Sequence, residues 1–340
     1  MDSNDRDLIQ TSAERILQSA DLHSIDSTAA SSTARDNLWA TLEENGFTKI
    51  CVAAAHGGTG ASFADGLVLA GLCGRYALPL PLANTVLAGY LLSQTGITPP
   101  SGGIACIIPD GIMSRVNHAE QCSHAIDIVS RDKQPFLRLF ALGDSEPLAN
   151  GDDHVALFDS STATLVQSIP TQTTARTYTA LGALSRAVLM TGAMQSILEL
   201  TLSYTTGREQ FGRPLAKFQA IQHHLSDIAS ETAAATAAIE LASEAIELNN
   251  NAIDCTANTE LLNAIAVAKI RCGQAATRVA ANAHQAHGAM GFTHDYPLGR
   301  YTRRLWQWQD EFGSETSWSI ELGHHILDSN PPALWPLLSA

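Results

Sequence analysis

Apolar residues recur at three- and four-residue spacing over most of the chain, which is the period of an amphipathic helix. Glycine or polar residues follow most of these segments, as at helix ends. The later segments are long and rich in alanine, and small side chains let helices approach closely, so we expect an antiparallel bundle there. Helices are predicted in this way over residues 5–19, 33–45, 63–76, 180–206, 219–249, 259–287 and, as a pair, 297–327.

Between residues 102 and 175 the pattern changes to short apolar runs separated by polar turn residues, which is typical of strands. The runs are GIACIIP, AIDIVS, PFLRLFAL, HVALF and ATLVQSI. The predicted fold class is therefore mainly α with a small β domain. We expect an N-terminal helical domain over 1–100, a reduced β domain over 101–175 and a C-terminal four-helix bundle over 176–340.

Charge and apolar content narrow the classes of partner. The chain has 20 Lys and Arg against 34 Asp and Glu, a net charge of -14, which repels phosphate backbones and anionic lipids. Prolines at 79 and 81 interrupt the most apolar stretch, 66–92, so no membrane span of about 20 apolar residues is expected there. Proteins or small molecules are the expected partners, without nucleic acid or membrane.

The cysteines and histidines do not have the spacing of a metal site. Six cysteines show neither a CxxC pair nor zinc-ligand spacing, and twelve histidines include no HExxH arrangement. We therefore predict no metal, and among the histidines His287 is the one to examine because it lies in a motif described below. The opening residues lack a basic-then-apolar signal pattern, so a cytoplasmic location is expected.

One helical stripe is broken by REQFG, residues 208–212, which raises the question of whether these residues also do chemistry. The surrounding YTTGREQFGRPLAKFQAIQHHLSDIA resembles one signature of the acyl-CoA dehydrogenase family, and HQAHGAMGFTHDYPLGRYTRR resembles its second signature. The two occur in the right order. LEENGFTKICVAAAHGGTGASFADGLVLAGLCGRYALPLPLA is similar, less specifically, to the family's amino-terminal helical domain.

The resemblance implies that these two signatures grip the ADP half of FAD across a subunit interface. A guanidinium suits phosphate oxygens, and a glycine turn lets backbone amides approach an anion. Taken alone, REQFG favours a capping or salt-bridging arginine and a loop-anchoring phenylalanine, and the second signature reverses that preference. The implied FAD-binding residues are Arg208 at the pyrophosphate, Phe211 on the adenosine side, Gln219 or Gln222 near the adenine, and Gln285, Gly288 and Ala289 along the diphosphate, together with Gln210.

The sequence departs from the family where the reaction takes place. The family's Thr-Glu-Pro-Gly-Ala-Gly-Ser-Asp loop and Trp-Ile-Thr turn, which hold the flavin ring, do not occur between residues 100 and 175. The reaction also needs a carboxylate near the substrate's α-carbon. Phe312 stands where a glutamate usually precedes the glycine, here Gly313, and the alternative positions 182–185 hold no carboxylate. We predict no catalytic base in this chain, with Glu311 as the alternative if the loop shifts by one residue.

RRLWQWQDEFGSETSW resembles small subunits of heteromeric acyl-CoA dehydrogenases that act on CoA-thioester side chains of degraded steroids. The resemblance implies an α2β2 heterotetramer in which this chain gives half of an interfacial FAD site. A second acyl-CoA dehydrogenase-like chain would bring the base, and an electron-transfer flavoprotein would accept the electrons. Two alternatives are a self-sufficient homomeric acyl-CoA dehydrogenase with Glu311 as base, and a flavin-free scaffold or interaction subunit.

Overall fold

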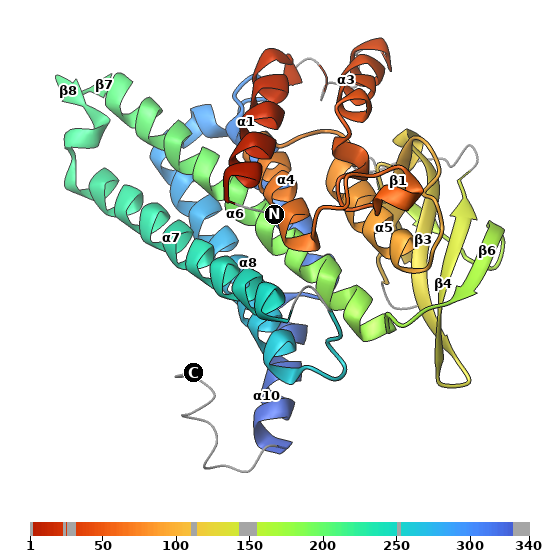
Figure 1. The fold of residues 1–340 in the computed structure, drawn as a ribbon. Coiled ribbons are helices and arrows are strands. Elements are labelled where there is room, and N and C mark those ends of the chain that lie inside the picture. Colours follow the sequence, from red (N-terminus) through yellow and green to blue (C-terminus); the bar gives the residue numbers. More distant parts are fainter. Residues whose placement is uncertain are drawn as a thin grey trace.

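The computed structural model describes residues 3–22, 25, 32–109, 114–142, 155–249 and 253–328. Long helices make up most of this part and a small β region lies at one side, which confirms the predicted fold class (Figure 1). The N-terminal helices are α1 (Ser3–Ser19), α3 (Ser32–Glu44), α4 (Phe63–Arg75) and α5 (Leu82–Gln94), with short 3-10 turns at Phe47–Lys49 and Ala54–His56.

The C-terminal part is a helical bundle in which α7 packs along α8 and α8 along α6 (Figure 1). Alanines with no exposed surface, such as Ala235 and Ala275, lie between these helices and permit the close packing. The sequence-predicted positions of the helices are confirmed to within a few residues. The elements are α6 (Ala175–Gly207), α7 (Gln219–Leu248), α8 (Thr259–His287), α9 (Leu298–Asp310) and α10 (Glu315–Asp328), with 3-10 turns at Leu215–Lys217 and Gly288–Phe292 and a hairpin of β7 (Glu209–Gln210) and β8 (Arg213–Pro214).

The β region consists of two small sheets. Four strands pair in the order β1-β3-β4-β6, with β1 parallel to β3 and the other pairs antiparallel, while β2 pairs with β5. Five of the six strands coincide with the apolar runs of the sequence. The pattern missed β2, whose residues SRVN are mostly polar. The strands are β1 (Gly103–Cys106), β2 (Ser114–Asn117), β3 (Cys122–Arg131), β4 (Gln134–Ala141), β5 (Val155–Phe158) and β6 (Thr164–Pro170), with a 3-10 turn at Ala119–Gln121.

Glycines allow α4 to cross α6 at very short range. A Cβ built on Gly74 would stand 2.0 Å from the Leu189 carbonyl oxygen, and one on Gly192 would stand 2.1 Å from that of Gly71. One apolar core runs from Ala13 through these helices into the bundle, and a smaller cluster lies in the β region. The N-terminal helices and the bundle are therefore packed as one body, and the proposed three-domain division stays a prediction.

Helix α6 connects the β region to the far end of the bundle. Near its start, the Tyr178 hydroxyl lies 2.8 Å from the Ile107 carbonyl oxygen and 3.1 Å from that of Ile126. Among the described residues it is the one helix long and apolar enough to cross a membrane, but 83% of its most apolar segment is buried inside the protein. The burial shows that these apolar residues are used in the core of the fold.

Candidate functional site

The position expected for the catalytic base is filled by an aromatic ring. Phe312 is 1% exposed, and its ring meets the Tyr178 ring edge-on with centroids 5.7 Å apart. The Arg186 guanidinium lies over the same ring, 5.0 Å from its centroid. On α6, a Cβ built on Gly182 would stand 2.3 Å from the ring. The two positions at which the family carries its base are thus in contact here, and neither bears a carboxylate.

The loop that carries Phe312 is fixed by hydrogen bonds from two helices. Phe312 and Gly313 both adopt positive φ, 55° and 96°, and the Trp318 indole N–H donates to the Phe312 carbonyl oxygen at 2.9 Å. On the other side, Lys269 of α8 donates to the carbonyl oxygens of Trp308 (2.5 Å) and Gln309 (3.0 Å) in the last turn of α9, where carbonyl oxygens lack partners within the helix. These contacts set the direction of the turn that follows.

Glu311 is sealed inside the protein and does not face a substrate-accessible surface. Its side chain is 1% exposed, forms an ion pair with Arg186 and accepts a hydrogen bond from the Asn117 side-chain amide of β2. Arg186 also donates to the Asn84 side-chain oxygen at 2.7 Å. Both oxygens of the carboxylate are therefore engaged by groups of this chain, which argues against the alternative in which Glu311 is the catalytic base.

A second buried cation stands close to this pair. Lys269 has no exposed surface, and burial lowers its pKa to about 7, although the negative charge of Glu311 opposes the shift. Neither Arg186 nor Lys269 was singled out from the sequence. The available signal was a cation inside an apolar helical stripe, as in ALSRAVLM and AVAKI, because a charge at such a position is buried and needs a partner.

Little space remains beside the cluster. A cavity of about 30 Å³ lies between α4, α5, α6 and α9, and it is enough for a water molecule or two but not for an acyl group. Its walls are polar, with Asn84, Asn117, Arg186 and Arg304 among them. The chain therefore has only a small polar pocket where its helices meet the β region.

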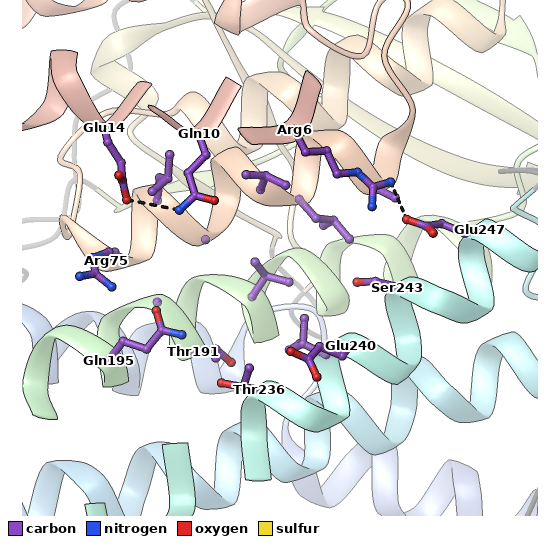
Figure 2. Close-up of a pocket in the computed structure, with 18 residues that line it drawn as sticks. Arg6, Gln10, Glu14, Arg75, Thr191, Gln195, Thr236, Glu240, Ser243 and Glu247 are labelled. Atoms are coloured by element: carbon purple, nitrogen blue, oxygen red, sulfur yellow. Dashed lines mark hydrogen bonds and ion pairs between the residues drawn. The ribbon is translucent and has the colours of Figure 1, made fainter. Parts of the chain in front are cut away.

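A larger cleft of about 310 Å³ lies elsewhere, between α1 and α4 on one side and α6 and α7 on the other (Figure 2). Apolar side chains such as Leu67 and Val188 line it, and Arg6 closes one end by an ion pair to Glu247 at 2.5 Å. Figure 2 also places Glu14 and Glu240 at its edge. Arg6 and Arg75 line the same cleft, so its rim carries charges of both signs.

The two signature segments meet at one end of the bundle, away from the β region (Figure 1). The Tyr204 ring of α6 stacks on the His287 ring of α8 with centroids 4.5 Å apart, and its hydroxyl donates to the His287 carbonyl oxygen at 3.4 Å. His287 also lies 3.0 Å from the Tyr296 hydroxyl. Burial lowers the pKa of His287, and the ring packs between the helix ends.

All eight residues implied in FAD binding are exposed at this end. Arg208 directly follows α6 and makes no ion pair within the part of the chain that the structure describes. Gly288 directly follows α8 with φ 59°, and a Cβ built on it would meet nothing within 4 Å. An unpaired guanidinium and an open glycine turn fit a diphosphate. The exposed residues are Arg208, Gln210, Phe211, Gln219, Gln222, Gln285, Gly288 and Ala289.

The free thiols of the chain are not reactive groups in this structure. All six cysteines are buried and unpaired in disulfides, and burial raises the pKa of Cys73 and Cys106 to about 12. A thiol with such a pKa is protonated at neutral pH and is a poor nucleophile. We therefore do not assign a cysteine as a nucleophile in this structure.

Comparison with known proteins agrees with the geometry. Residues 173–306 match the family described as "Acyl-CoA dehydrogenase, C-terminal domain". The acyl-CoA dehydrogenase IpdE2 of Mycolicibacterium smegmatis is 28% identical over 276 residues, covering 79% of this chain and 81% of that protein. The 3-sulfinopropanoyl-CoA desulfinase of Paraburkholderia xenovorans is 36% identical, but over 34% of this chain and 28% of that one.

Solved structures share the fold over nearly the whole chain. The Tcur3481–Tcur3483 steroid ACAD variant superimposes with a TM-score of 0.78 at 21% identity, covering 96% of this chain and 98% of that one. The ChsE4–ChsE5 complex from Mycobacterium tuberculosis gives a TM-score of 0.70 at 20% identity, covering 87% and 89%. Residues 173–306 thus form an acyl-CoA dehydrogenase C-terminal domain, and the chain as a whole shares the acyl-CoA dehydrogenase fold.

Proposed function

We propose that this chain is one subunit of a heteromeric acyl-CoA dehydrogenase. In this proposal its bundle end holds the ADP half of an FAD whose ring lies on a second acyl-CoA dehydrogenase-like chain. The observation that carries it is the ring of Phe312 packed on Gly182, with Glu311 bound by Arg186. This chain lacks the catalytic base but keeps the residues on the nucleotide side of the cofactor. Those residues can contribute to catalysis in a complex whose second chain carries the base.

The length of α6 supports the use of two chains for one cofactor. Tyr178 touches the β region at one end of this helix, and Arg208 follows it at the other end. Thirty residues of α helix rise roughly 45 Å, which is longer than one dinucleotide extends. Arg208 is thus too far from the β region of its own chain for one FAD to reach both, as expected for a cofactor held across an interface.

The reaction of the complex would be α,β-desaturation of a CoA thioester. The partner's carboxylate takes the α-proton, the β-hydrogen leaves with its electron pair, and a C=C bond forms between the two carbons. When bound, FAD supplies the acceptor of that hydride. In this chain Arg208 and the backbone around Gly288 bind and orient the diphosphate, while Gln219 or Gln222 lies near the adenine.

The names of the related proteins suggest the substrate class and the partner. One structural neighbour is described as a steroid ACAD, and another is a complex of two different chains, ChsE4 and ChsE5. We therefore infer a steroid-derived acyl-CoA as the substrate and an α2β2 assembly. An electron-transfer flavoprotein is the electron acceptor in this proposal, and the cytoplasm is the compartment.

Flavin stoichiometry tests the proposal. The tagged chain is produced alone and together with a second acyl-CoA dehydrogenase-like chain from the same organism, and flavin and protein are quantified in each purified sample. We expect colourless or insoluble protein alone, and a yellow complex with about one flavin per pair of chains, because a ligand bound across an interface stabilises that interface. An active homomer with one flavin per chain would contradict the proposal.

A further inference from the structure

The close crossing of α4 and α6 leaves an open cleft between the helices that flank them. A Cβ built on Gly192 of α6 would stand 2.1 Å from the Gly71 carbonyl oxygen of α4, so these two helices are in direct contact. Helix α1 packs on α4, and α7 packs on α6 and α8. The cleft of about 310 Å³ lies between the two pairs (Figure 2), and its volume is within the range of ligand sites.

The floor of this cleft is apolar. Buried side chains of α4 and α6, among them Leu67, Leu72 and Val188, form it, and Ile239 of α7 adds to one side. Gly71 has no side chain to fill the space, since a Cβ built there would come no closer than 3.6 Å to Val188. Such a surface favours a ligand with an apolar body, because covering it removes apolar area from water.

Three polar side chains of the cleft act as hydrogen-bond acceptors. The Thr191 hydroxyl donates to the Ala187 carbonyl oxygen at 3.0 Å, and the Thr236 hydroxyl donates to that of Thr232 at 3.0 Å. Each hydroxyl has one hydrogen, so its oxygen remains available only as an acceptor. Glu240 stands one turn after Thr236 on α7, and an ionised carboxylate only accepts. Figure 2 shows all three side chains directed into the cleft.

Both arginines that line the cleft are already paired with carboxylates. Arg6 forms ion pairs with Asp65 at 2.6 Å and with Glu247 at 2.5 Å. Arg75 forms an ion pair with Glu199 at 2.8 Å. An anionic ligand would have to compete with these carboxylates for either guanidinium.

Two further carboxylates give the cleft a net negative charge. Glu14 of α1 and Glu240 of α7 line it, and neither forms an ion pair with another residue that the structure describes. With the partners of both arginines counted, two cations stand against five carboxylates, a net charge of -3. The charge and the acceptors therefore both favour a cation over an anion.

We propose that this cleft binds a small organic cation, a primary ammonium group on an apolar body. The ammonium donates to Glu240 and to the hydroxyl oxygens of Thr191 and Thr236, while the apolar body covers Leu67 and Val188. An ammonium group has three hydrogens to donate and no acceptor, which matches this set of acceptors. The inference does not depend on the proposed function, because none of the residues implied in FAD binding lines the cleft.

Probes that share one tail and differ in the head group test this chemistry. Octylammonium, octanol and octanoate are titrated into the purified chain, alone and in complex with its partner, and the dissociation constants are measured by calorimetry or ligand-observed NMR. We expect octylammonium to bind about 10-fold more tightly than octanol, the effect of a charge-assisted hydrogen bond, and octanoate to bind most weakly. Butylammonium should bind at least about 10-fold more weakly than octylammonium, because its shorter tail buries less apolar surface.

Glu240→Gln locates the bound ammonium group. The variant should lose the preference for octylammonium over octanol and still bind octanol, because the contacts of the tail remain. Glu244→Gln is the matched control. It removes an exposed carboxylate one turn further along α7 and outside the cleft, so it should keep the preference.

Several results would overturn the inference. Equal binding of octylammonium and octanol, no binding of any probe, or a preference that persists in Glu240→Gln would each show that the cleft does not select an ammonium group. Binding to the isolated chain that is lost in the complex would show that the cleft belongs to an interface between chains. A chain that binds octylammonium through Glu240 but takes up no partner and no flavin would contradict the proposed function alone.

Discussion

The ring of Phe312 lies directly on the backbone of Gly182, so close that a methyl group on Gly182 would stand 2.3 Å from the ring. Arg186, one turn further along α6, places its guanidinium over the same ring and binds Glu311. The loop and the helix are thus complementary in shape and charge. We conclude that this part of the fold has a structural role in this chain.

Gly182→Ala tests that packing directly. The added methyl group should force the loop or the helix to move, at a cost of about 1–3 kcal/mol in the free energy of unfolding. Denaturant unfolding of the isolated chain measures the change. Gly207→Ala in the same helix is the control, because a Cβ there meets nothing within 4 Å, and it should be neutral or slightly stabilising. Equal effects of the two substitutions would show that Phe312 does not pack as described.

Glu311→Gln distinguishes a structural carboxylate from a catalytic one. The substitution leaves Arg186 buried without its counter-charge, so the free energy of unfolding should fall by about 3 kcal/mol or more. Turnover per flavin in the assembled complex should stay within about twofold of the wild type, because no transition-state contact is lost. Glu315→Gln, on the neighbouring helix α10, controls for the loss of a negative charge. A stable variant that binds flavin but has lost α-proton exchange would make Glu311 the base.

The buried Lys269 predicts a pH-dependent stability. The pKa of Lys269 is about 7 in the folded chain, against an ordinary value of 10.5. Between these two pH values the unfolded chain binds more protons than the folded chain, so the contribution of Lys269 to the stability of the fold rises with pH. The free energy of unfolding of the wild type, relative to Lys269→Met, should therefore increase from pH 7 to pH 10, by at most about 1.4 kcal/mol per pH unit.

Denaturant unfolding at several pH values measures this difference. Lys217→Met, which removes an exposed lysine, is the control and should run parallel to the wild type. A difference between wild type and Lys269→Met that stays constant with pH would contradict the buried, easily deprotonated amine.

The order of helices and strands was predictable because periodic apolar residues report directly on which face is buried. The exceptions have physical reasons. Helix α5 was not among the predicted helices, and because all its residues from Leu82 to Leu92 are buried, no apolar stripe marks one face. Strand β2 is short and polar, and it is held by pairing with the distant strand β5. The paired residues Asn117 and Val155 are 38 positions apart in the sequence, and Ser114 and Phe158 are 44 positions apart. The apolar run of α6, which meets a membrane-span criterion, is buried by packing that no local pattern reveals.

The site was predictable in part. The residues predicted from the two signatures do lie together at one exposed end of the bundle. The absence of a base at Phe312 could be read from the sequence of the loop alone. The pair of Arg186 and Glu311 joins residues 125 positions apart, and Asn117 reaches the same carboxylate from 194 positions away. Such contacts depend on tertiary packing, and the sequence shows only that a charge stands in an apolar stretch.

The affinity of the complex for FAD tests the central claim most directly. Deflavinated complex is titrated with FAD, with either wild-type chain or Arg208→Ala in this subunit, and Arg176→Ala at the opposite end of α6 is the control. We predict that Arg208→Ala weakens FAD binding by roughly 10-fold or more, the loss of a charge-assisted contact to phosphate. An unchanged FAD affinity in that variant would contradict the account.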